Sequence, residues 1–251
     1  MCRHVGYLGS AVALSDLLLE PEHSLLEQAF APADMRGGGT INADGFGVGW
    51  YREDGSTARY RSAAPMWTDQ SFRDIAGEVR SGAVVAAVRS ATVGMPVVPD
   101  ACAPFTDGRW LFSHNGRVTG WPDSVAKLAA RLDVVDLLKM EAATDSALLW
   151  ALLRQRLLDG AEPAVAMSEL VGEVAAAAPD SRLNLLLSDG SRVVATTWTH
   201  SLWVRRGSAA VTVASEPFGA RDGWCEVPDR SVVVAEADDV QVRPLAEMGE
   251  R

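Results

Sequence analysis

The stretch Ala83-Val84-Val85-Ala86-Ala87-Val88 is a continuous run of small apolar residues that ends at Arg89. Such a run is typical of a β-strand that is buried on both faces, because a strand with one solvated face alternates apolar and polar residues. The sequence therefore predicts a strand inside a layered fold.

Around this strand, other strands are predicted towards both ends of the chain and helices between them. The expected strands are 2–8, 46–51, 57–62, 109–113, 183–188, 192–199, 202–206, 209–214, 231–235 and 240–243. The expected helices are 14–20, 22–30, 69–80, 123–131, 145–158 and 163–178. Strands and helices do not alternate regularly, which argues against a doubly wound parallel sheet. We therefore predict an α+β fold of mostly antiparallel sheets packed face to face, with helices outside, as a single domain over 1–251.

Composition excludes several classes of protein. The chain has 251 residues, of which 23 are Lys or Arg and 33 are Asp or Glu, so its net charge is −10. Without a basic block it is a poor ligand for nucleic acid or an anionic membrane surface. Cys2, Cys102 and Cys225 are too few and too far apart for a disulfide framework or a zinc site. With no signal peptide and no apolar run of about 18–20 residues, we expect a cytoplasmic protein that needs no cofactor or metal and binds a small molecule.

Cys2 is the first residue with a chemical role to consider. Removal of Met1, which a small second residue permits, would leave a thiol and an α-amine in one residue. An α-amine has a pKa of about 7.7–8.0 and a thiol about 8.5, so the amine is matched to accept the thiol proton near neutral pH. Taken alone, the same start also fits an incidental buried cysteine on a first strand.

Three further segments carry groups that suit an amide substrate. Arg89 ends a buried strand and offers a fork of donors to a carboxylate, although a surface arginine is the alternative. Asn115 and the backbone N–H of Gly116 can aim two donors at one oxygen, as in an oxyanion hole, but Asn-Gly is also the composition of a hairpin turn. Asp145 either caps a helix or binds an ammonium group.

Taken together, these segments resemble the class II glutamine amidotransferases over nearly the whole chain. The matching motifs are Cys2, Asn42-Ala43-Asp44-Gly45-Phe46-Gly47, Arg89-Ser90-Ala91-Thr92-Val93-Gly94, His114-Asn115-Gly116 and Thr144-Asp145-Ser146. A narrower likeness is to the branch that hydrolyses γ-glutamyl hercynylcysteine S-oxide in ergothioneine biosynthesis. Its motifs are Met1-Cys2-Arg3-His4, Ser215-Glu216-Pro217-Phe218, Trp224 and Val227-Pro228. The resemblance implies a four-layer αββα sandwich of the N-terminal-nucleophile (Ntn) hydrolases.

The resemblance also implies a role for each matching residue. Cys2 would attack the γ-carbonyl of a γ-glutamyl group and form a thioester, and Asn115 and Gly116 would stabilise the oxyanion. Arg89 would bind the α-carboxylate and Asp145 the α-ammonium group.

Ser90 and Thr92 are the remaining substrate-binding candidates that the resemblance suggests. Many members that use glutamine carry Trp in place of Ser90 and His in place of Val93. The smaller side chains of this sequence leave space for a larger amine portion.

Other functions and sites remain as alternatives. The chain could be a glutaminase subunit that supplies ammonia to a separate synthase, or a binding module without turnover. The length leaves no room for an attached synthase domain, which favours hydrolysis. Gly37-Gly38-Gly39 is not followed by the Lys-Ser/Thr of a phosphate loop, and is expected to be an active-site loop or a plain turn. One or two of the eight Trp residues could hold a trimethylammonium group by cation–π contact.

Overall fold

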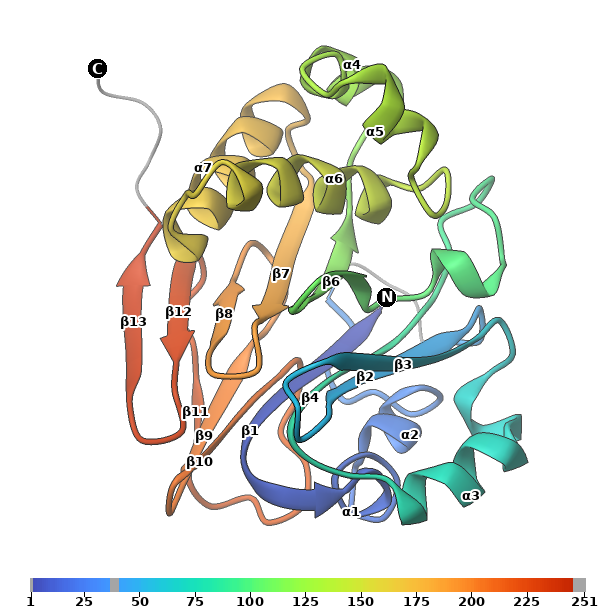
Figure 1. Ribbon diagram of the computed structural model, residues 1–251, viewed down its shortest axis with the longest axis vertical. Coiled ribbons are helices and arrows are strands. Elements are labelled where there is room, and N and C mark those ends of the chain that lie inside the picture. The colour runs from blue at the N-terminus through green and yellow to red at the C-terminus, as the bar shows by residue number, and fades with distance from the viewer. Residues whose placement is uncertain (1, 37–40, 246–251) are drawn as a thin grey trace.

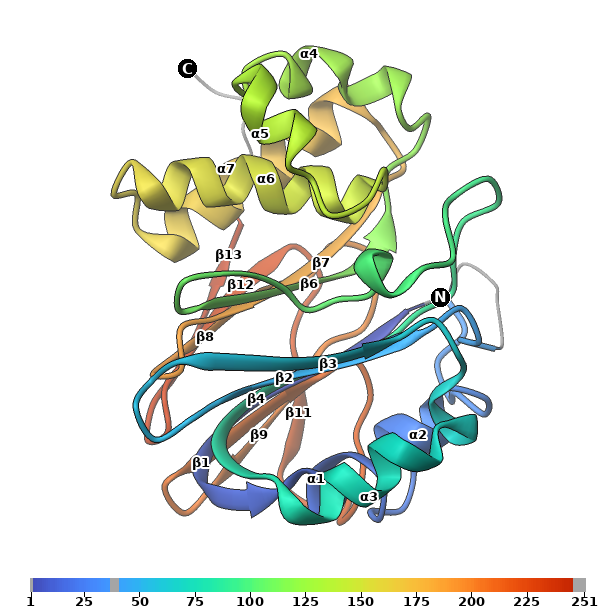
Figure 2. The ribbon, with the colours of Figure 1, turned by 45° about the vertical axis from the view of Figure 1, so that its right-hand side comes forward.

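The computed structural model of the protein describes residues 2–36 and 41–245. In this part of the chain the strands form two antiparallel sheets that pack face to face, and helices cover the outer face of each sheet (Figures 1 and 2). This is the four-layer αββα order that the family resemblance implies, and the predicted α+β fold is confirmed. The segment Gly37-Gly38-Gly39 lies outside the described residues.

The first sheet has seven strands with β1 and β4 near its centre. In spatial order they are β11 (Trp224–Glu226), β9 (Trp203–Gly207), β10 (Ala210–Ala214), β1 (Arg3–Ala13), β4 (Arg80–Val88), β2 (Phe46–Tyr51) and β3 (Thr57–Ser62). The central strand β4 contains the apolar run predicted to be buried on both faces, and residues 83–88 are all buried. β1 pairs with β4 and β10 at the same time, with Val5 opposite both Ala86 and Ala214.

The second sheet has six strands. In spatial order they are β13 (Val240–Pro244), β12 (Ser231–Ala235), β8 (Val193–Thr196), β7 (Arg182–Ser188), β6 (Trp110–Arg117) and β5 (Phe105–Asp107). β6 continues through Asn115 and Gly116, which lie opposite Asn184 and Leu183 of β7. The hairpin-turn alternative for Asn115-Gly116 is therefore wrong.

Each sheet has its own set of helices (Figure 2). The six-stranded sheet is covered by η3 (Asp123–Val125), α4 (Ala126–Ala129), α5 (Val134–Leu138), α6 (Asp145–Leu158) and α7 (Pro163–Ala177). The seven-stranded sheet is covered by α1 (Leu14–Leu18), α2 (Leu25–Gln28) and α3 (Gln70–Glu78). Two short 3₁₀ turns, η1 (Met66–Thr68) and η2 (Pro99–Ala101), lie in the connections. No helix among the described residues has the length and apolar character that a membrane crossing requires.

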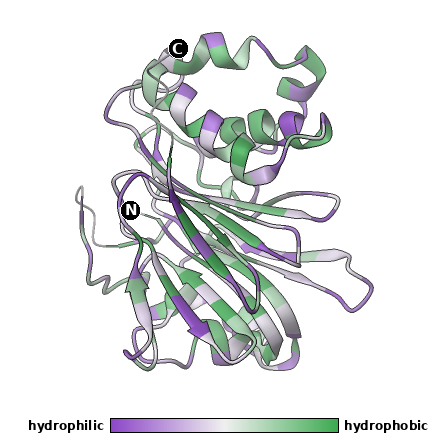
Figure 3. Ribbon diagram, turned by 90° about the vertical axis from the view of Figure 1, so that its left-hand side faces the viewer, coloured by the Kyte–Doolittle hydropathy of each residue, from purple (hydrophilic) through white to green (hydrophobic). Residues whose placement is uncertain are grey.

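Apolar side chains fill the three interfaces between the four layers. Figure 3 shows the hydropathy of each residue along the ribbon, with many apolar residues on the strands and helices. Between the sheets, Leu186 of β7 is fully buried and packs close to β1. A Cβ atom at Gly6 would lie 3.2 Å from Leu186 Cδ1, so the missing side chain at Gly6 lets the two sheets approach. In the outer layer, Phe112 of β6 stacks on Trp150 of α6 with ring centroids 5.5 Å apart.

The predicted bounds of β2, β3, α6 and β12 are those observed, whereas β5, β11 and α5 were not predicted. β5 and β11 have three residues each, which is too short to show a period-2 pattern, and α5 buries no side chain completely. The helix expected at 22–30 is shorter, at Leu25–Gln28, and that expected at 123–131 is divided into η3 and α4.

We expect Leu186→Ala to lower the free energy of unfolding by about 2–5 kcal/mol, because it leaves a cavity where the two sheets meet. Urea denaturation followed by circular dichroism measures this change. Leu138→Ala is the control, since Leu138 is 80% exposed and its truncation should change stability by less than about 0.5 kcal/mol. Equal losses in the two variants would contradict the described packing between the sheets.

Candidate active site

The antiparallel pairing of β1 with β4 brings Cys2 next to Arg89. Arg3 lies opposite Val88, so the residues just outside the paired segment, Cys2 and Arg89, are neighbours. The Cys2 thiol Sγ lies 3.7 Å from the carbonyl oxygen of Ser90. Cys2 and Arg89 line one small cavity, together with residues from β6 and from the start of α6. Segments from four parts of the sequence therefore meet around the thiol.

The loop that precedes β2 holds the backbone of Arg89. The Arg89 N–H donates to the Gly45 carbonyl (2.8 Å), and its carbonyl accepts from the Asp44 N–H (3.0 Å). The Asp44 carboxylate accepts from the Ala91 N–H (2.7 Å), which holds the next turn as well. Arg89 Nη1 donates to the Pro96 carbonyl (2.9 Å), and the described residues provide no second acceptor for this buried guanidinium. Its other N–H groups are therefore available to a ligand carboxylate.

Gly45 and Cys102 pack against each other beneath this loop. Gly45 has φ +113°, and a Cβ there would lie 2.4 Å from Cys102 Sγ, so the position requires glycine. The Cys102 thiol is fully buried, and burial raises its pKa to about 11. Cys102 is therefore an inert packing residue, unlike the partly exposed Cys2.

Asn115 is almost fully buried and is connected to β1 through Ser215. Asn115 Nδ2 donates to Ser215 Oγ (3.1 Å), and the same Oγ accepts from the His4 N–H (3.0 Å). The Ser215 N–H in turn donates to the His4 carbonyl (3.0 Å). A single hydroxyl thus joins the two sheets close to Cys2.

Gly116 permits a close approach between β6 and β7. A Cβ atom at Gly116 would lie 1.8 Å from the Arg182 carbonyl oxygen and 2.6 Å from His114 Nε2. His114 uses both ring nitrogens locally, with Nδ1 3.0 Å from Ser146 Oγ and Nε2 2.9 Å from the Arg182 carbonyl. These contacts tie β6 to α6 and β7, so His114 supports the strand that carries Asn115.

Asp145 is the first residue of α6, but it is not the N-cap. Thr144 caps the helix by accepting the Ala147 N–H (3.2 Å), so the capping alternative for Asp145 is wrong. The buried Asp145 carboxylate accepts from the N–H groups of Val118 (2.8 Å) and Ser146 (2.7 Å). It holds the chain that leaves β6, and its oxygens retain lone pairs for a ligand ammonium group.

Thr92 lies in a different cavity from Cys2. That cavity has a volume of about 390 Å³ and is formed by 92–95, 117–122 and Ala143. The structure therefore separates two candidates that the sequence had grouped, because Ser90 contacts the thiol through its carbonyl whereas Thr92 faces the outer cavity.

No motif assigned a role to Arg3 and Glu216, which form a buried ion pair behind Cys2. Arg3 also donates to the carbonyls of Cys2 (3.0 Å) and Asp34, which fixes the backbone at the candidate nucleophile Cys2. Glu216 further accepts from His23 Nε2 (2.7 Å) and from a backbone N–H. Burial opposes its ionisation, but the hydrogen bond from His23 and the charge of Arg3 hold the pKa of Glu216 below its ordinary value. The sequence signals for this pair were the position of Arg3 in the Met1–His4 motif and that of Glu216 in the Ser215–Phe218 motif.

Two histidines are buried uncharged behind the site. Burial, together with His114, His200 and Arg3, lowers the pKa of His4 to about 3. Burial and the charges of Arg182 and Arg3 lower the pKa of His200 to about 3 as well. Both imidazoles are therefore neutral at physiological pH.

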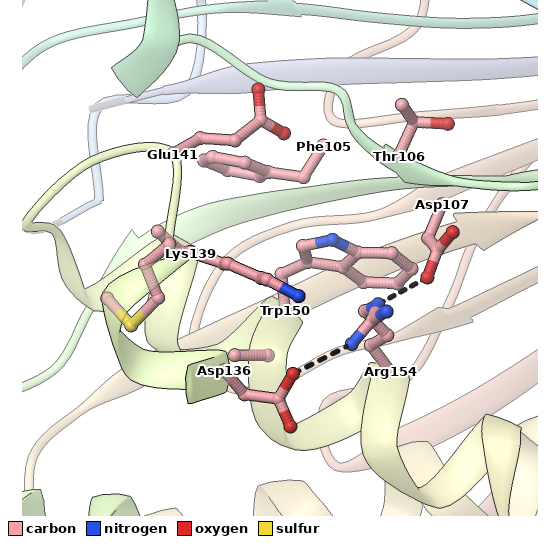
Figure 4. Close-up of a pocket in the computed structure, with 11 residues that line it drawn as sticks. Phe105, Thr106, Asp107, Asp136, Lys139, Glu141, Trp150 and Arg154 are labelled. Carbon is pink, nitrogen blue, oxygen red and sulfur yellow. Dashed lines mark hydrogen bonds and ion pairs between the residues drawn. The ribbon is translucent and has the colours of Figure 1, made fainter. Parts of the chain in front are cut away.

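Another cavity, of about 210 Å³, lies between β5, α5 and α6 (Figure 4). Arg154 points towards Asp107 and Asp136 there and pairs with both. Glu141, at its rim, pairs with Arg59 and Arg61. None of the predicted site residues lines this cavity, and most of its charges are paired within the protein.

Comparison with known proteins gives one family and several close relatives. The family described as "Glutamine amidotransferases class-II" matches residues 28–220. The gamma-glutamyl-hercynylcysteine sulfoxide hydrolase of Mycolicibacterium smegmatis is 42% identical over 98% of this chain and 100% of its own length. The protein of the same name from Mycobacterium tuberculosis is 44% identical over 93% of this chain and 92% of its own length.

Solved structures show the same fold. A glutamine aminotransferase class-II domain protein from Silicibacter pomeroyi has a TM-score of 0.70 and 26% identity, over 98% of this chain and 100% of that one. Glutamine phosphoribosylpyrophosphate amidotransferase from B. subtilis has a TM-score of 0.67 over 98% of this chain and 49% of that one. At 13% identity, the second likeness concerns the fold alone.

We expect the free energy of unfolding to fall as the pH drops from about 6.5 towards 3, the interval between the ordinary and the lowered pKa values of His4 and His200. In that interval the unfolded chain binds protons that the folded protein excludes, so acid favours unfolding. His200→Gln should make the slope shallower by about 1.4 kcal/mol per pH unit, as measured by urea denaturation at several pH values. An unchanged slope would mean that His200 titrates in the folded protein.

Proposed function

This chain belongs to the class II glutamine amidotransferases, and from that premise we propose that it hydrolyses the γ-glutamyl amide bond of γ-glutamyl-hercynylcysteine sulfoxide and releases glutamate. The observation that carries the proposal is the place of Cys2, with its thiol 3.7 Å from the Ser90 carbonyl and in one cavity with Arg89. We take the whole chain, 1–251, as one catalytic domain.

The named relatives favour hydrolysis over ammonia supply. They are themselves called hydrolases of this sulfoxide, and one of them is matched along its entire length. The alternative, a glutaminase subunit that passes ammonia to a synthase, has no comparable support among these relatives.

The first half of the reaction uses Cys2 as the nucleophile. Arg89 holds the α-carboxylate of the γ-glutamyl group and Asp145 its α-ammonium group, which aligns the γ-carbonyl with the thiol. The Cys2 thiol attacks that carbon, and its proton passes through the Cys2 α-amine to the leaving amine. Asn115 and the Gly116 N–H stabilise the negative oxygen of the tetrahedral intermediate. The C–N bond then breaks, which leaves a γ-glutamyl thioester and the free amine.

The second half of the reaction is hydrolysis of the thioester. A water molecule gives one proton to the α-amine of Cys2 and attacks the thioester carbon, and the same two donors stabilise the second oxyanion. The C–S bond breaks, the thiolate recovers the proton, and glutamate leaves. These two reaction steps need no metal ion, since the attacking thiol and the base that accepts its proton lie in one residue.

A cavity of about 590 Å³ on the helix-covered face of the seven-stranded sheet has a lining that suits a cationic group. Trp203, Phe218 and Trp224 line it together with several carboxylates, and Glu216 forms part of its wall. Arg3 pairs with Glu216 in the wall of this cavity and donates to the backbone carbonyl of Cys2, so the cavity is linked to the Cys2 backbone, whereas the Cys2 thiol faces the space between the two sheets. Aromatic faces with nearby carboxylates attract quaternary ammonium groups.

We expect Cys2→Ala to reduce glutamate release by about 10⁴-fold or more, because no other group can form the thioester. Cys225→Ala is the matched control, since this cysteine is exposed and does not line the thiol's cavity, and it should retain full activity. Glutamate release is measured by a coupled assay, and intact mass should show that the active protein lacks Met1. Normal turnover in Cys2→Ala would exclude the proposed nucleophile.

A panel of γ-glutamyl amides tests the substrate. We expect kcat/KM for γ-glutamyl-hercynylcysteine sulfoxide to exceed that for glutamine by about 100-fold or more, since contacts to the large amine add transition-state binding. The panel should contain glutamine, γ-glutamyl-cysteine and γ-glutamyl methylamide as well. Preferred hydrolysis of glutamine, rising further with a partner synthase, would favour the glutaminase alternative.

A further inference from the structure

The Ser215 hydroxyl lies between the two sheets and accepts two hydrogen bonds there. Its Oγ accepts from the His4 N–H (3.0 Å) and from Asn115 Nδ2 (3.1 Å). Its own proton then has no acceptor among the described residues. At the other end of the same amide, Asn115 Oδ1 is buried and also lacks a partner. One buried donor and one buried acceptor thus stand unused on two touching side chains, which is costly.

Exchanging the oxygen and nitrogen of the Asn115 amide gives the Ser215 proton an acceptor and Asn115 Oδ1 a donor, and leaves only the amide NH₂ without a protein partner. The two ends of an amide have nearly the same shape, and the hydrogen-bond network assigns them. After the exchange, the Ser215 hydroxyl still accepts the His4 N–H and donates its proton to Asn115 Oδ1 over the same 3.1 Å. The amide NH₂ then occupies the buried place that has no protein partner.

We propose that Ser215 is the positioning residue of the oxyanion hole: its hydroxyl holds the Asn115 oxygen, so that the Asn115 NH₂ is aimed at the substrate oxyanion. This proposal rests on the function proposed above and deepens it. Ser215 touches Asn115 rather than the substrate, so it acts on the reaction through the amide that it orients.

The strands place this NH₂ on the face of β6 that is turned towards β1 and Cys2. His4 Nδ1 lies 3.4 Å from Ser113 Oγ, so the side chain of His4 faces β6. Cys2 is two residues before His4, and Asn115 is two residues after Ser113, so each shares the face of its neighbour. The thiol and the amide therefore face the same space between the two sheets.

The backbone of Ser215 is itself fixed on both sides. Its N–H donates to the His4 carbonyl (3.0 Å), and its carbonyl accepts from Ser201 Oγ (2.9 Å). The side chain is 1% exposed, so no water competes for the hydroxyl from bulk solvent. A donor held in this way needs no reorganisation when charge develops on the substrate oxygen.

Ser215→Ala should lower kcat for the best γ-glutamyl substrate by about 10–100-fold and change KM by less than about threefold, because the donor acts only in the transition state. Ser215→Thr keeps the hydroxyl and should recover kcat to within about fivefold of the wild type. Alkylation of Cys2 by iodoacetamide should proceed at the wild-type rate in both variants, since the thiol itself is untouched. A rise in KM at constant kcat, or slow alkylation, would overturn the positioning role.

A double-mutant cycle separates positioning from general destabilisation. In the Asn115→Ala background, Ser215→Ala should have no further effect on kcat, because the amide that it orients is absent. Ser188→Ala is the matched control. Ser188 is equally buried at the last position of β7, and its hydroxyl donates to the Arg192 carbonyl. It should lower Tm without lowering kcat. Independent losses of kcat from Ser215 and Asn115 would overturn the proposal.

A crystal structure tests the amide directly, whatever the substrate proves to be. At about 1 Å resolution, a C=O bond of about 1.23 Å is distinguished from a C–N bond of about 1.33 Å. The shorter bond should point to Ser215 Oγ. If the amide nitrogen faces Ser215 instead, the positioning proposal fails even though the hydrolase function stands. If the panel of γ-glutamyl amides shows no hydrolysis, the proposed function fails, while the crystal structure still shows which end of the amide faces Ser215.

Discussion

The antiparallel register between β1 and β4 is the constraint on which the site depends. With Arg3 opposite Val88, Cys2 emerges from the sheet beside Arg89, which places the proposed nucleophile next to the guanidinium proposed to bind the substrate carboxylate. A shift of one residue would turn every side chain of β1 to the other face and carry His4 away from β6. The register is held from both sides, because β1 is paired with β10 as well as with β4. Catalytic geometry is thus set by the backbone of a central strand rather than by a loop.

Behind the thiol, polar groups take the place of an apolar core. The buried Arg3–Glu216 pair and the Ser215 hydroxyl connect the start of β1 to the chain after β10, and Asn115 extends that connection to the second sheet. Buried charges and amides stabilise little compared with well-packed apolar groups, but breaking one of them leaves a partner unpaired at a high cost. Such a network keeps Asn115 and Cys2, the proposed oxyanion donor and nucleophile, in one arrangement.

Much of this site was predictable from local patterns. The apolar run that ends at Arg89 indicated a strand buried on both faces, and it is β4. The family motifs indicated Cys2, Asn115 and Asp145 before any fold was known. The bounds of α6 followed from its apolar spacing and polar start. Where a signal was too short, as in β5 and β11, no pattern could separate a strand from a loop.

The amino-acid order alone determined the layered α+β class and the residue types of the site, because periodicity and motifs are local properties of the chain. It did not determine whether Asn115-Gly116 forms a hairpin turn or continues strand β6, because the composition Asn-Gly suits both conformations. Pairing with β7 selects the strand. Nor did the amino-acid order show that Thr144 caps α6 and leaves Asp145 to the site, or that Ser215 reaches Asn115 from 100 residues away. These depend on hydrogen bonds between distant segments, and such partners are chosen only when the two sheets have packed.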